Sequence, residues 1–534
     1  MRLLLLILAI CIAAFGYSAA KDRAAVRFDA KIINLSTLGA DHPAQFPTVI
    51  GGTARRALTL SFAESGEAQI MRLRIVADGP YEIWQAGNLQ IDRAHCGAAA
   101  ECRVDVHLTR DRRQVHLIAA SPITLRAVSA ELFRAQRVAQ TGGIPVTTAL
   151  CLLALLAPAM WRASSGMRNR IVCAAALLWM AAIDWRFMAA MLALLGLFFV
   201  LLRITEARPD RRMAFITVVL GAIGVLLFVK VAEPLAAGFL ADPAGMLLLP
   251  IGFSYFIIRI IDLAFKVYAR QIAVPGPLEY FAYMLFPPAL AAGPIMAISE
   301  YRDGARAFTT LESRTEGLMR ITIGIAKKLA ADAFVLPLVT AGMADGFFGQ
   351  DNHSVPVVLL ATTLYVYLDF SAYSDMAIGL GRWWGWRMPE NFNWPLLRTN
   401  MREFWRHWHM SLTKWVTRHV FIQASMEVRR SARWMQATLP VFATMLTIGI
   451  WHGLEAVWVL WAAHHAAGML AGDAVLRLWQ KRGETSQPLA WAATAFGIAF
   501  VWYWVSLGHS FTTTSSVREA IDNYLCFASL GLLR

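Results

Sequence analysis

Apolar runs long enough to cross a lipid bilayer dominate the chain from residue 144 onward. A transmembrane helix needs about 20 consecutive, mainly apolar residues. We predict crossings near residues 144–161, 171–184, 187–203, 213–232, 244–264, 278–298, 319–340 and 354–378, two within 437–476, and others near 489–508 and 511–532. Hydrophobic residues make up 57% of the 534 residues and charged residues 16%, whereas soluble domains have about 45–50% and about 25%. The sequence therefore predicts a mainly α, polytopic transmembrane helical bundle and excludes a soluble globular or disordered chain.

Prolines interrupt several of these runs, at Pro250, Pro287, Pro288, Pro294 and Pro337. Proline has no backbone N–H and breaks the helical hydrogen-bond ladder. In lipid, the freed backbone groups must be satisfied by protein or by water in a cavity. We therefore expect the broken segments to surround an internal cavity.

Basic residues recur in short clusters between the apolar runs and give a net charge of +14. One cluster follows the first run, at Arg162, Arg168 and Arg170, and another surrounds Arg208. Such clusters mark the cytoplasmic ends of transmembrane segments. The charge therefore predicts topology and contact with membrane lipid, and we expect no nucleic-acid partner.

The N-terminus has the pattern of a signal sequence. An apolar run, Leu3–Phe15, precedes the small residues Ser18, Ala19 and Ala20. We predict a signal peptide or signal anchor over 1–20, an exported domain over 21–137 and a membrane domain over 138–534.

Residues 21–137 contain short alternating runs, such as Ile70–Ala77 and Gln114–Ala119, separated by turn signals. Runs of this length and spacing predict an antiparallel β-sandwich. A spacer or docking role is favoured over catalysis, although Tyr81 and Trp84 could stack on a sugar ring.

Two cysteines of this segment, Cys96 and Cys102, are close in sequence and lie in the part that we expect to be exported. Export places them in an oxidising compartment, so we predict a small disulfide loop.

His452 and Glu455 are the only ionisable residues between Ala437 and Ala462. An ionisable side chain inside a membrane segment is costly and by default indicates function. The alternative is a structural histidine that donates to a carbonyl group in a helix break. Glu455 could orient the imidazole or simply face the outer aqueous phase. From the residues alone, this pair indicates acid–base chemistry or proton movement.

A second polar stretch runs over 369–418. Arg398, Arg402 and Arg406 recur every four residues, so a helical segment would present them as one basic stripe suited to phosphates. The alternative is an interfacial helix that binds lipid headgroups through its Trp and Arg side chains.

Long strings within residues 249–507 resemble the membrane-bound O-acyltransferase family, in its bacterial branch of alginate O-acetylation and teichoic acid D-alanyl transfer. The strings are Tyr367–Gly379, Pro389–Phe392, Arg402–Leu412 and Trp451-His452-Gly453, with Trp461 and His465 downstream. The chain departs from that branch at Leu454, Glu455 and Ala456, at His407 in place of the usual Arg, and in its β domain.

The resemblance implies catalytic roles for two histidines. His452 would take the proton from the attacking hydroxyl, and His409 or a backbone N–H would hold the oxyanion. Arg398, Arg402 and Arg406 would attract the donor's phosphates. Other motif residues are expected to support the site: Asp369, Asp375, Asn391, Trp451, Glu455 and His465. We expect direct transfer rather than an acyl-enzyme.

The resemblance also implies a bacterial inner membrane, with the domain over 21–137 in the periplasm. The implied donor is acyl-CoA or another acyl thioester, with no bound cofactor or metal. The implied acceptor is an exported polysaccharide, or a periplasmic acyltransferase partner that passes an acetyl group on. A teichoic-acid-like or lipid acceptor is an alternative. Two other function classes are a proton-coupled transporter and a scaffold subunit of a polysaccharide export complex.

Overall fold

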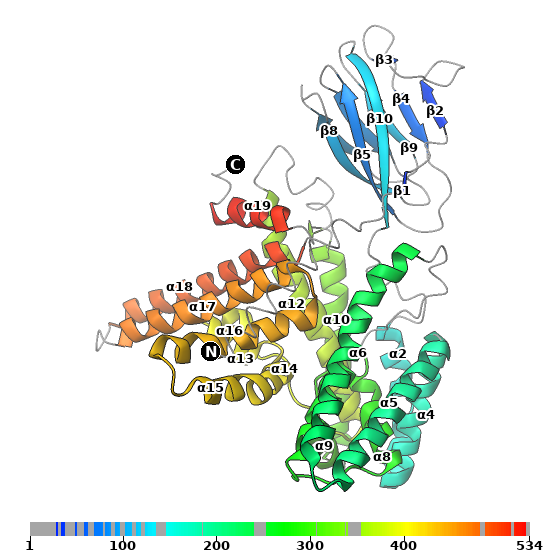
Figure 1. Ribbon diagram of the computed structural model, residues 1–534, viewed down its shortest axis with the longest axis vertical. Helices are drawn as coiled ribbons and strands as arrows, with labels where there is room; N and C mark the ends of the chain where they lie inside the picture. Colours follow the sequence, from blue (N-terminus) through cyan, green and yellow to red (C-terminus); the bar gives the residue numbers. More distant parts are fainter. Residues whose placement is uncertain are drawn as a thin grey trace. The chain divides into compact units, whose positions relative to one another are not determined.

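The chain divides into two compact units, one that contains the helices and one that contains the strands (Figure 1). The structure, a computed structural model, describes the helical unit over residues 146–239, 253–339, 354–480, 486–513 and 517–529, except for 184, 306 and 337. In the other unit it describes the strands between Phe28 and Arg134. The predicted signal segment, 1–20, lies outside the described residues.

The strand unit contains two antiparallel sheets. Its strands are β1 (Phe28–Asp29), β2 (Asn34–Thr37), β3 (Thr48–Ile50), β4 (Leu58–Ser61), β5 (Gln69–Ala77), β6 (Tyr81–Ala86), β7 (Ile91–Cys96), β8 (Cys102–Leu108), β9 (Gln114–Ile118) and β10 (Ile123–Arg134). One five-stranded sheet has the order β1-β10-β5-β8 with β3 on β10, and the other has the order β2-β4-β9-β6-β7. The packing of the two sheets into a sandwich stays a prediction.

Two predictions for this unit depend on side chains that the structure does not describe. Cys96 ends β7 in one sheet and Cys102 begins β8 in the other. The disulfide between them stays a prediction, as does sugar contact by Tyr81 and Trp84.

The rest of the described chain is helical, so the mainly α prediction is confirmed. The helices before the second polar stretch are α2 (Val146–Ala154), α3 (Ala157–Arg162), α4 (Ser165–Ile183), α5 (Trp185–Ala207), α6 (Arg211–Phe239), α7 (Phe253–Tyr268), α8 (Pro277–Met284), η2 (Pro287–Ala289), α9 (Ile298–Gly304), α10 (Leu311–Ala330), η3 (Ala331–Val335) and α12 (Ser354–Trp384). Those that follow are η4 (Pro395–Leu397), α13 (Met401–His407), α14 (Met410–Val416), η5 (Thr417–Phe421), α15 (Ile422–Val428), α16 (Arg433–His452), α17 (Ala456–Gln480), α18 (Gln487–Gly508), η6 (His509–Phe511) and α19 (Val517–Ala528).

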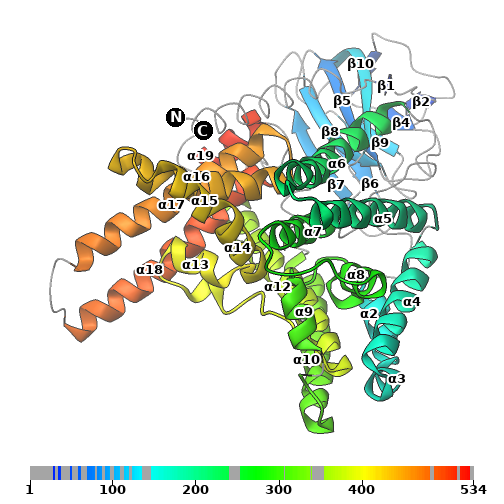
Figure 2. The ribbon, with the colours of Figure 1, turned by 60° about the horizontal axis from the view of Figure 1, so that its bottom comes forward.

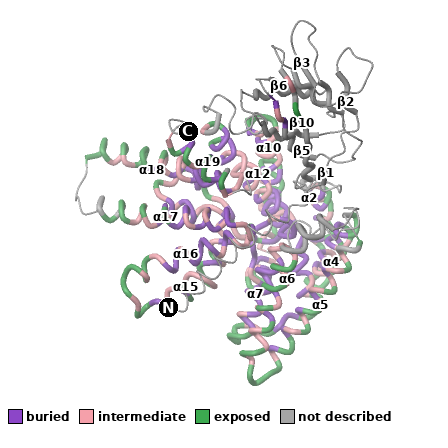
Figure 3. Tube along the Cα trace, turned by 45° about the horizontal axis from the view of Figure 1, so that its top comes forward, coloured by how far each residue is buried: buried purple, intermediate pink, exposed green. Residues whose placement is uncertain are grey.

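Within the described residues, five helices are long and apolar enough to cross a membrane. They are Met188–Ala207, Arg211–Lys230, Pro356–Trp384, Arg433–His452 and Gln487–Phe511. Large apolar side chains are exposed on them, among them Phe228 at 72% and Phe496 at 72%, and Figure 3 shows exposed positions along α6 and α18. Contact with lipid explains such exposure.

The predicted crossing at 278–298 is wrong. Instead of one helix, the chain forms α8, the 3₁₀ turn η2 and α9. Pro287 and Pro288 stand where a continuous helix would need their missing N–H groups. The prediction of a crossing at 511–532 is also wrong, because α19 has only 12 residues and a span needs about 20.

Side chains satisfy the backbone of the broken segment 284–298. From α7, Arg259 donates to Tyr283 O (3.1 Å) and Ala289 O (3.0 Å). Tyr283 Oη donates to Met296 O at 2.8 Å. Protein atoms therefore replace the lost helical hydrogen bonds of this segment.

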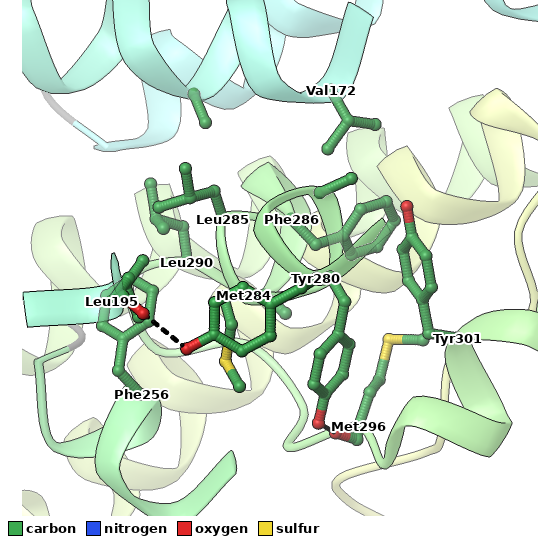
Figure 4. Packing of buried hydrophobic residues seen from close by; sticks show 14 of the residues in the cluster. Val172, Leu195, Phe256, Tyr280, Met284, Leu285, Phe286, Leu290, Met296 and Tyr301 are labelled. Atoms are coloured by element: carbon green, nitrogen blue, oxygen red, sulfur yellow. Dashed lines mark hydrogen bonds between the residues drawn. The ribbon is translucent and has the colours of Figure 1, made fainter. Parts of the chain in front are cut away.

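The broken segment is packed among buried apolar side chains (Figure 4). Tyr280 Oη donates to Leu195 O in α5 at 3.0 Å, and Phe286 lies against Tyr301 with ring centroids 5.4 Å apart. This packing fixes the segment between α4, α5 and α7.

The buried residues of the helical unit form two main hydrophobic clusters. The first gathers α2 to α9 and the C-terminal part of α12, and the second gathers α13 to α19. Helix α7 contributes to both, with Ile257 and Ile260 in the first and Ile258 in the second. α16 and α17, and α17 and α18, pack as neighbours in the second cluster (Figure 2). α7 therefore forms a shared wall between the two clusters.

Helices α10 and α12 approach closely at glycines. A Cβ added to Gly317 would lie 2.6 Å from Gly379 O, and one added to Gly379 would lie 2.6 Å from Gly317 O. A Cβ on Gly324 would lie 2.6 Å from Ala372 O. Small residues of this kind let two membrane helices pack backbone to backbone.

Candidate active site

His452 is the last residue of α16, where the chain turns into α17. α16 has 20 residues, which corresponds to a length of about 30 Å. His452 and the basic residues around Arg433 therefore lie at opposite ends of a helix as long as the bilayer core is thick. Two helices therefore stand where two crossings are predicted within 437–476, with His452 at their junction; α16 is one of the five helices long and apolar enough to cross a membrane, and a crossing by α17 stays a prediction.

The His452 residue is exposed while three indole rings surround its imidazole. The ring stacks on Trp458 at a centroid distance of 5.0 Å and contacts Trp451 at 4.8 Å and Trp461 at 5.9 Å. Lys230 Nζ, from α6, donates to His452 O at 3.0 Å. An imidazole that is accessible and held by aromatic rings can meet a substrate.

Gly453 ends α16 and makes room for the side chains that follow. A Cβ at this position would overlap Trp458 Nε1 and would lie 2.6 Å from Glu455 Oε2. The glycine therefore lets the carboxylate of Glu455 and the indole of Trp458 fold over the end of the helix.

His409 is held between three other elements. It precedes α14 in a left-handed conformation, with φ of 42°, and its side chain is buried. Its ring contacts Phe370 of α12 (4.8 Å), Tyr255 of α7 (6.2 Å) and Trp451 of α16 (6.2 Å). Trp451 thus contacts both His409 and His452, which brings the two predicted catalytic histidines to one region.

Asn391 organises the surroundings of His409. Its Oδ1 accepts hydrogen bonds from Ser411 Oγ (2.7 Å) and Ser411 N (3.3 Å), and its Nδ2 donates to Ser374 Oγ (3.1 Å). Ser411 Oγ in turn accepts from Ile295 N of the broken segment at 2.9 Å. The predicted supporting residue Asn391 is therefore the centre of a buried polar network.

A row of rings continues from His452 along α17. Trp461 contacts His452, and His465 lies 4.4 Å from Trp461 and 5.4 Å from Trp405 by ring centroid. Trp458, Trp461 and His465 are spaced three and four residues apart, which places them on one helical face. His465 Nδ1 is buried without a hydrogen-bond partner among the described residues.

The chain matches the model of the membrane-bound O-acyltransferase family over residues 138–517. It belongs to that family. It is 30% identical to a probable alginate O-acetylase of Pseudomonas fluorescens, over 56% of this chain and 58% of that protein. It is 25% identical to a teichoic acid D-alanyltransferase of Bacillus subtilis, over 48% of this chain and 67% of that protein.

A third relative is a peptidoglycan O-acetyltransferase of Helicobacter pylori, 29% identical over 42% of this chain and 43% of that protein. The chain spans about half the length of most of the curated relatives that it matches.

In this member of the family, the two supporting aspartates pair with cations of α10. Asp369 Oδ1 lies 2.7 Å from Lys328 Nζ, and Asp375 contacts both Arg320 (3.0 Å) and Lys327 (2.6 Å). These contacts tie α10 to α12. A direct role of either carboxylate in the chemistry stays a prediction.

The predicted basic stripe does not form on one helix. Arg398 precedes α13 and donates to Asn393 O at 2.7 Å, while Arg406 pairs with Glu403 at 2.5 Å. Arg402 makes two hydrogen bonds to the carboxylate of Asp473, one of 2.8 Å, and this contact raises the Arg402 pKa. Each guanidinium therefore has a partner within the chain, and donor binding by the three stays a prediction.

We expect the Arg402–Asp473 pair to stabilise the fold. Arg402→Asp alone and Asp473→Arg alone should lower the melting temperature in detergent, and the double variant should restore it, with a coupling of about 0.5–3 kcal/mol. If Arg402 also binds donor phosphates, the restored double variant will keep a raised KM for the thioester. Additive losses of stability would contradict the structural pair.

Charged residues on α7 were missed by the sequence reasoning. Arg259, Asp262 and Lys266 are all buried, and Asp262 binds Lys266 (2.9 Å), His419 (3.0 Å) and Arg418 (3.3 Å). They lie in or beside the predicted crossing 244–264. The rule that singled out His452, that ionisable residues in a crossing indicate function, would have found them too.

Proposed function

We propose that the protein is a membrane O-acyltransferase. It moves an acyl group, an acetyl group in the first instance, from a cytoplasmic thioester to a hydroxyl of an exported polysaccharide or of a periplasmic acyltransferase partner. The observation that carries the proposal is the accessible imidazole of His452 in the Trp-His-Gly turn, with the second imidazole of His409 against the same Trp451 ring. Family membership supports acyl transfer in particular.

The chemistry needs few groups because a thioester is already activated. The acceptor hydroxyl must lose its proton, a C–O bond must form at the acyl carbon, and the C–S bond must break. A positioned imidazole contributes about 10²–10⁴-fold to such a step. The donor would be acyl-CoA or another acyl thioester, and the proposal includes no bound cofactor.

The relatives support a polymer acceptor, because they are named for alginate, teichoic acid and peptidoglycan. The three relatives are 25% to 30% identical to this chain, so the identities favour none of the three polymers over the others. Alternation of apolar runs with basic clusters supports an inner-membrane location with the strand unit in the periplasm. A teichoic-acid-like or lipid acceptor is the second candidate within the same reaction.

Reconstitution of the full chain in lipid vesicles tests the function. Acetyl-CoA carrying a labelled acetyl group is supplied at the cytoplasmic face, and isolated polysaccharide, with and without an added periplasmic acyltransferase, is supplied at the other. We expect label on acceptor hydroxyls in an alkali-labile ester. Passage of unmodified solute or protons without ester formation would instead favour the transporter. The absence of both ester formation and passage would favour the scaffold.

A further inference from the structure

We propose that Lys230 is a positioning residue for His452, and that its ammonium group holds the Trp-His-Gly turn at the place where the imidazole can act. The proposal rests on the proposed function, in which His452 is the acid–base group. It gives a role to an ionisable residue of α6 that lies outside all of the motif strings.

Lys230 stands alone in a long apolar stretch. It is the only ionisable residue between Arg212 and Glu233, and it ends one of the five helices that could cross a membrane, Arg211–Lys230. An ionisable side chain within a membrane segment is costly and by default indicates function. Lys230 is half-buried, and its ammonium group donates to an atom of another helix.

The acceptor of this hydrogen bond is His452 O, which lies 3.0 Å from Lys230 Nζ. His452 is the last residue of α16, and the last carbonyl groups of a helix have no partner within the helix. The helix dipole also leaves partial negative charge at this end, which favours a cation. Lys230 therefore completes the C-terminal end of α16 at the residue that carries the imidazole.

The two helices meet at matching positions. Arg211–Lys230 and Arg433–His452 both have 20 residues, and each begins at an arginine and ends at one of the two contacting residues. Arginines at one end of a crossing mark its cytoplasmic side. The contact lies at the other end of both helices, so it fixes the depth of His452 relative to α6.

The contact also connects the two hydrophobic clusters of the helical unit. Val218 and Ala222 of α6 belong to the first cluster, whereas Ile448 of α16 belongs to the second. The three indole rings around the imidazole come from α16 and α17 and orient it within that pair of helices. Lys230 fixes the pair of helices to α6, which packs on α5 and α7.

The turn that carries the imidazole is short. Residues 453–455 separate α16 from α17. Two backbone hydrogen bonds at this point, Gly453 N to Gly449 O (2.9 Å) and Trp458 N to Glu455 O (3.0 Å), each lie on one side of the turn. The Lys230 contact comes from a residue 222 positions away. Since a displacement of about 1 Å at a reacting group can cost about 10²-fold in rate, loss of this contact should lower the rate.

Lys230→Met removes the ammonium group and keeps a flexible, unbranched side chain. We expect kcat for acyl transfer by the reconstituted protein to fall about 10- to 100-fold. The KM for the thioester should stay unchanged, because the lost contact positions the reacting group and not the donor. Lys230→Arg, whose guanidinium can donate to the same carbonyl, should keep most of the wild-type kcat. A wild-type kcat in Lys230→Met, or an equal loss in Lys230→Arg, would overturn the proposal.

Arg211→Met is the matched control. Arg211 begins the same helix, and its Nη1 donates to Val267 O, near the C-terminal end of α7, at 3.4 Å. The variant therefore removes the same kind of contact, from a cation of α6 to a carbonyl of a neighbouring helix, at the opposite end of the span from Lys230. We expect a wild-type kcat. Equal losses of kcat in both variants would mean that Lys230 acts on the whole fold, and would contradict a positioning role.

Solid-state NMR of the full chain in lipid separates this inference from the proposed function. With ¹⁵N in the lysine ammonium groups and ¹³C in the histidine carbonyl groups, dipolar recoupling should detect a close pair that disappears in Lys230→Met. Absence of that pair in the wild-type protein would refute the contact whether or not transfer is observed.

A second sample, labelled in the histidine rings, reports on the imidazole itself. We expect the His452 ring signals, assigned with His452→Asn, to move in Lys230→Met and to stay in place in Arg211→Met. Unchanged ring signals in Lys230→Met would also overturn the proposal. If the contact and the ring shifts are found and wild-type vesicles show no transfer, the proposed function fails instead.

Discussion

His452→Ala is expected to abolish acyl transfer while the protein remains folded. The imidazole is accessible, whereas the contact that ties this residue to α6 uses its backbone oxygen and survives the substitution. Loss of a general acid–base group lowers the rate by about 10²–10⁴-fold. Transfer of labelled acetyl to polysaccharide by reconstituted protein measures the effect, together with the melting temperature in detergent.

His464→Gln is the control for removal of a membrane histidine. His464 lies on the adjacent helix α17, and its Nε2 bonds Trp504 O at 2.8 Å, a contact that a glutamine amide can replace. We expect this variant to transfer at nearly the wild-type rate. Equal losses in both variants would indicate that His452 acts through the fold, and full activity in His452→Ala would refute its catalytic role.

Gly379→Ala is expected to destabilise the helical unit although it adds only one methyl group. The new Cβ would lie 2.6 Å from Gly317 O and 2.8 Å from Ile321 N, both on α10. Neither atom belongs to a flexible side chain, so α10 and α12 must move apart. Overpacking of this kind costs about 1–3 kcal/mol. The melting temperature of the purified protein in detergent measures the loss.

Gly224→Ala provides the comparison for that substitution. Gly224 lies in α6, and no atom lies within 4 Å of its added Cβ. Alanine has the higher helix propensity, by about 1 kcal/mol, so stability should be unchanged or higher. An unchanged melting temperature in Gly379→Ala would contradict the close approach of α10 and α12.

Membrane helices were predictable where the signal is local. Hydropathy and length located α5, α6, α12, α16 and α18, because lipid contact requires an apolar run whatever the neighbours are. The break at Pro287 was also visible in the sequence. How its backbone groups are satisfied was not, because Arg259 and Ser411 come from distant segments.

The sequence contains a local signal that argues against the predicted basic stripe. Pro395 stands in a 3₁₀ turn, and the Asn400 side chain accepts from Glu403 N at 2.9 Å, as the N-cap of α13. An Asn followed three residues later by Glu is typical of a helix start. The sequence thus predicts a helix from residue 401, which separates Arg398 from Arg402 and Arg406.

The motif strings identified His409 and Asn391 but not their relation. These residues are 18 positions apart, and His409 adopts a positive φ, which is uncommon for residues other than glycine. Strained conformations of this kind cluster at functional sites. The network around His409 is therefore a tertiary feature that sequence reasoning alone does not reach.

The buried charges of α7 have a consequence for how the protein is made. Each Arg, Asp or Lys at the centre of a helix raises the free energy of insertion through the translocon by about 2.5–3.5 kcal/mol. Of the groups that bind Asp262, His419 is synthesised 157 residues later. During translation, α7 therefore leaves the ribosome before His419 has been synthesised. Its final position in the bilayer depends on this later segment of the chain. We therefore expect this helix to integrate late, and we expect truncated chains that end before η5 to leave it at the membrane surface.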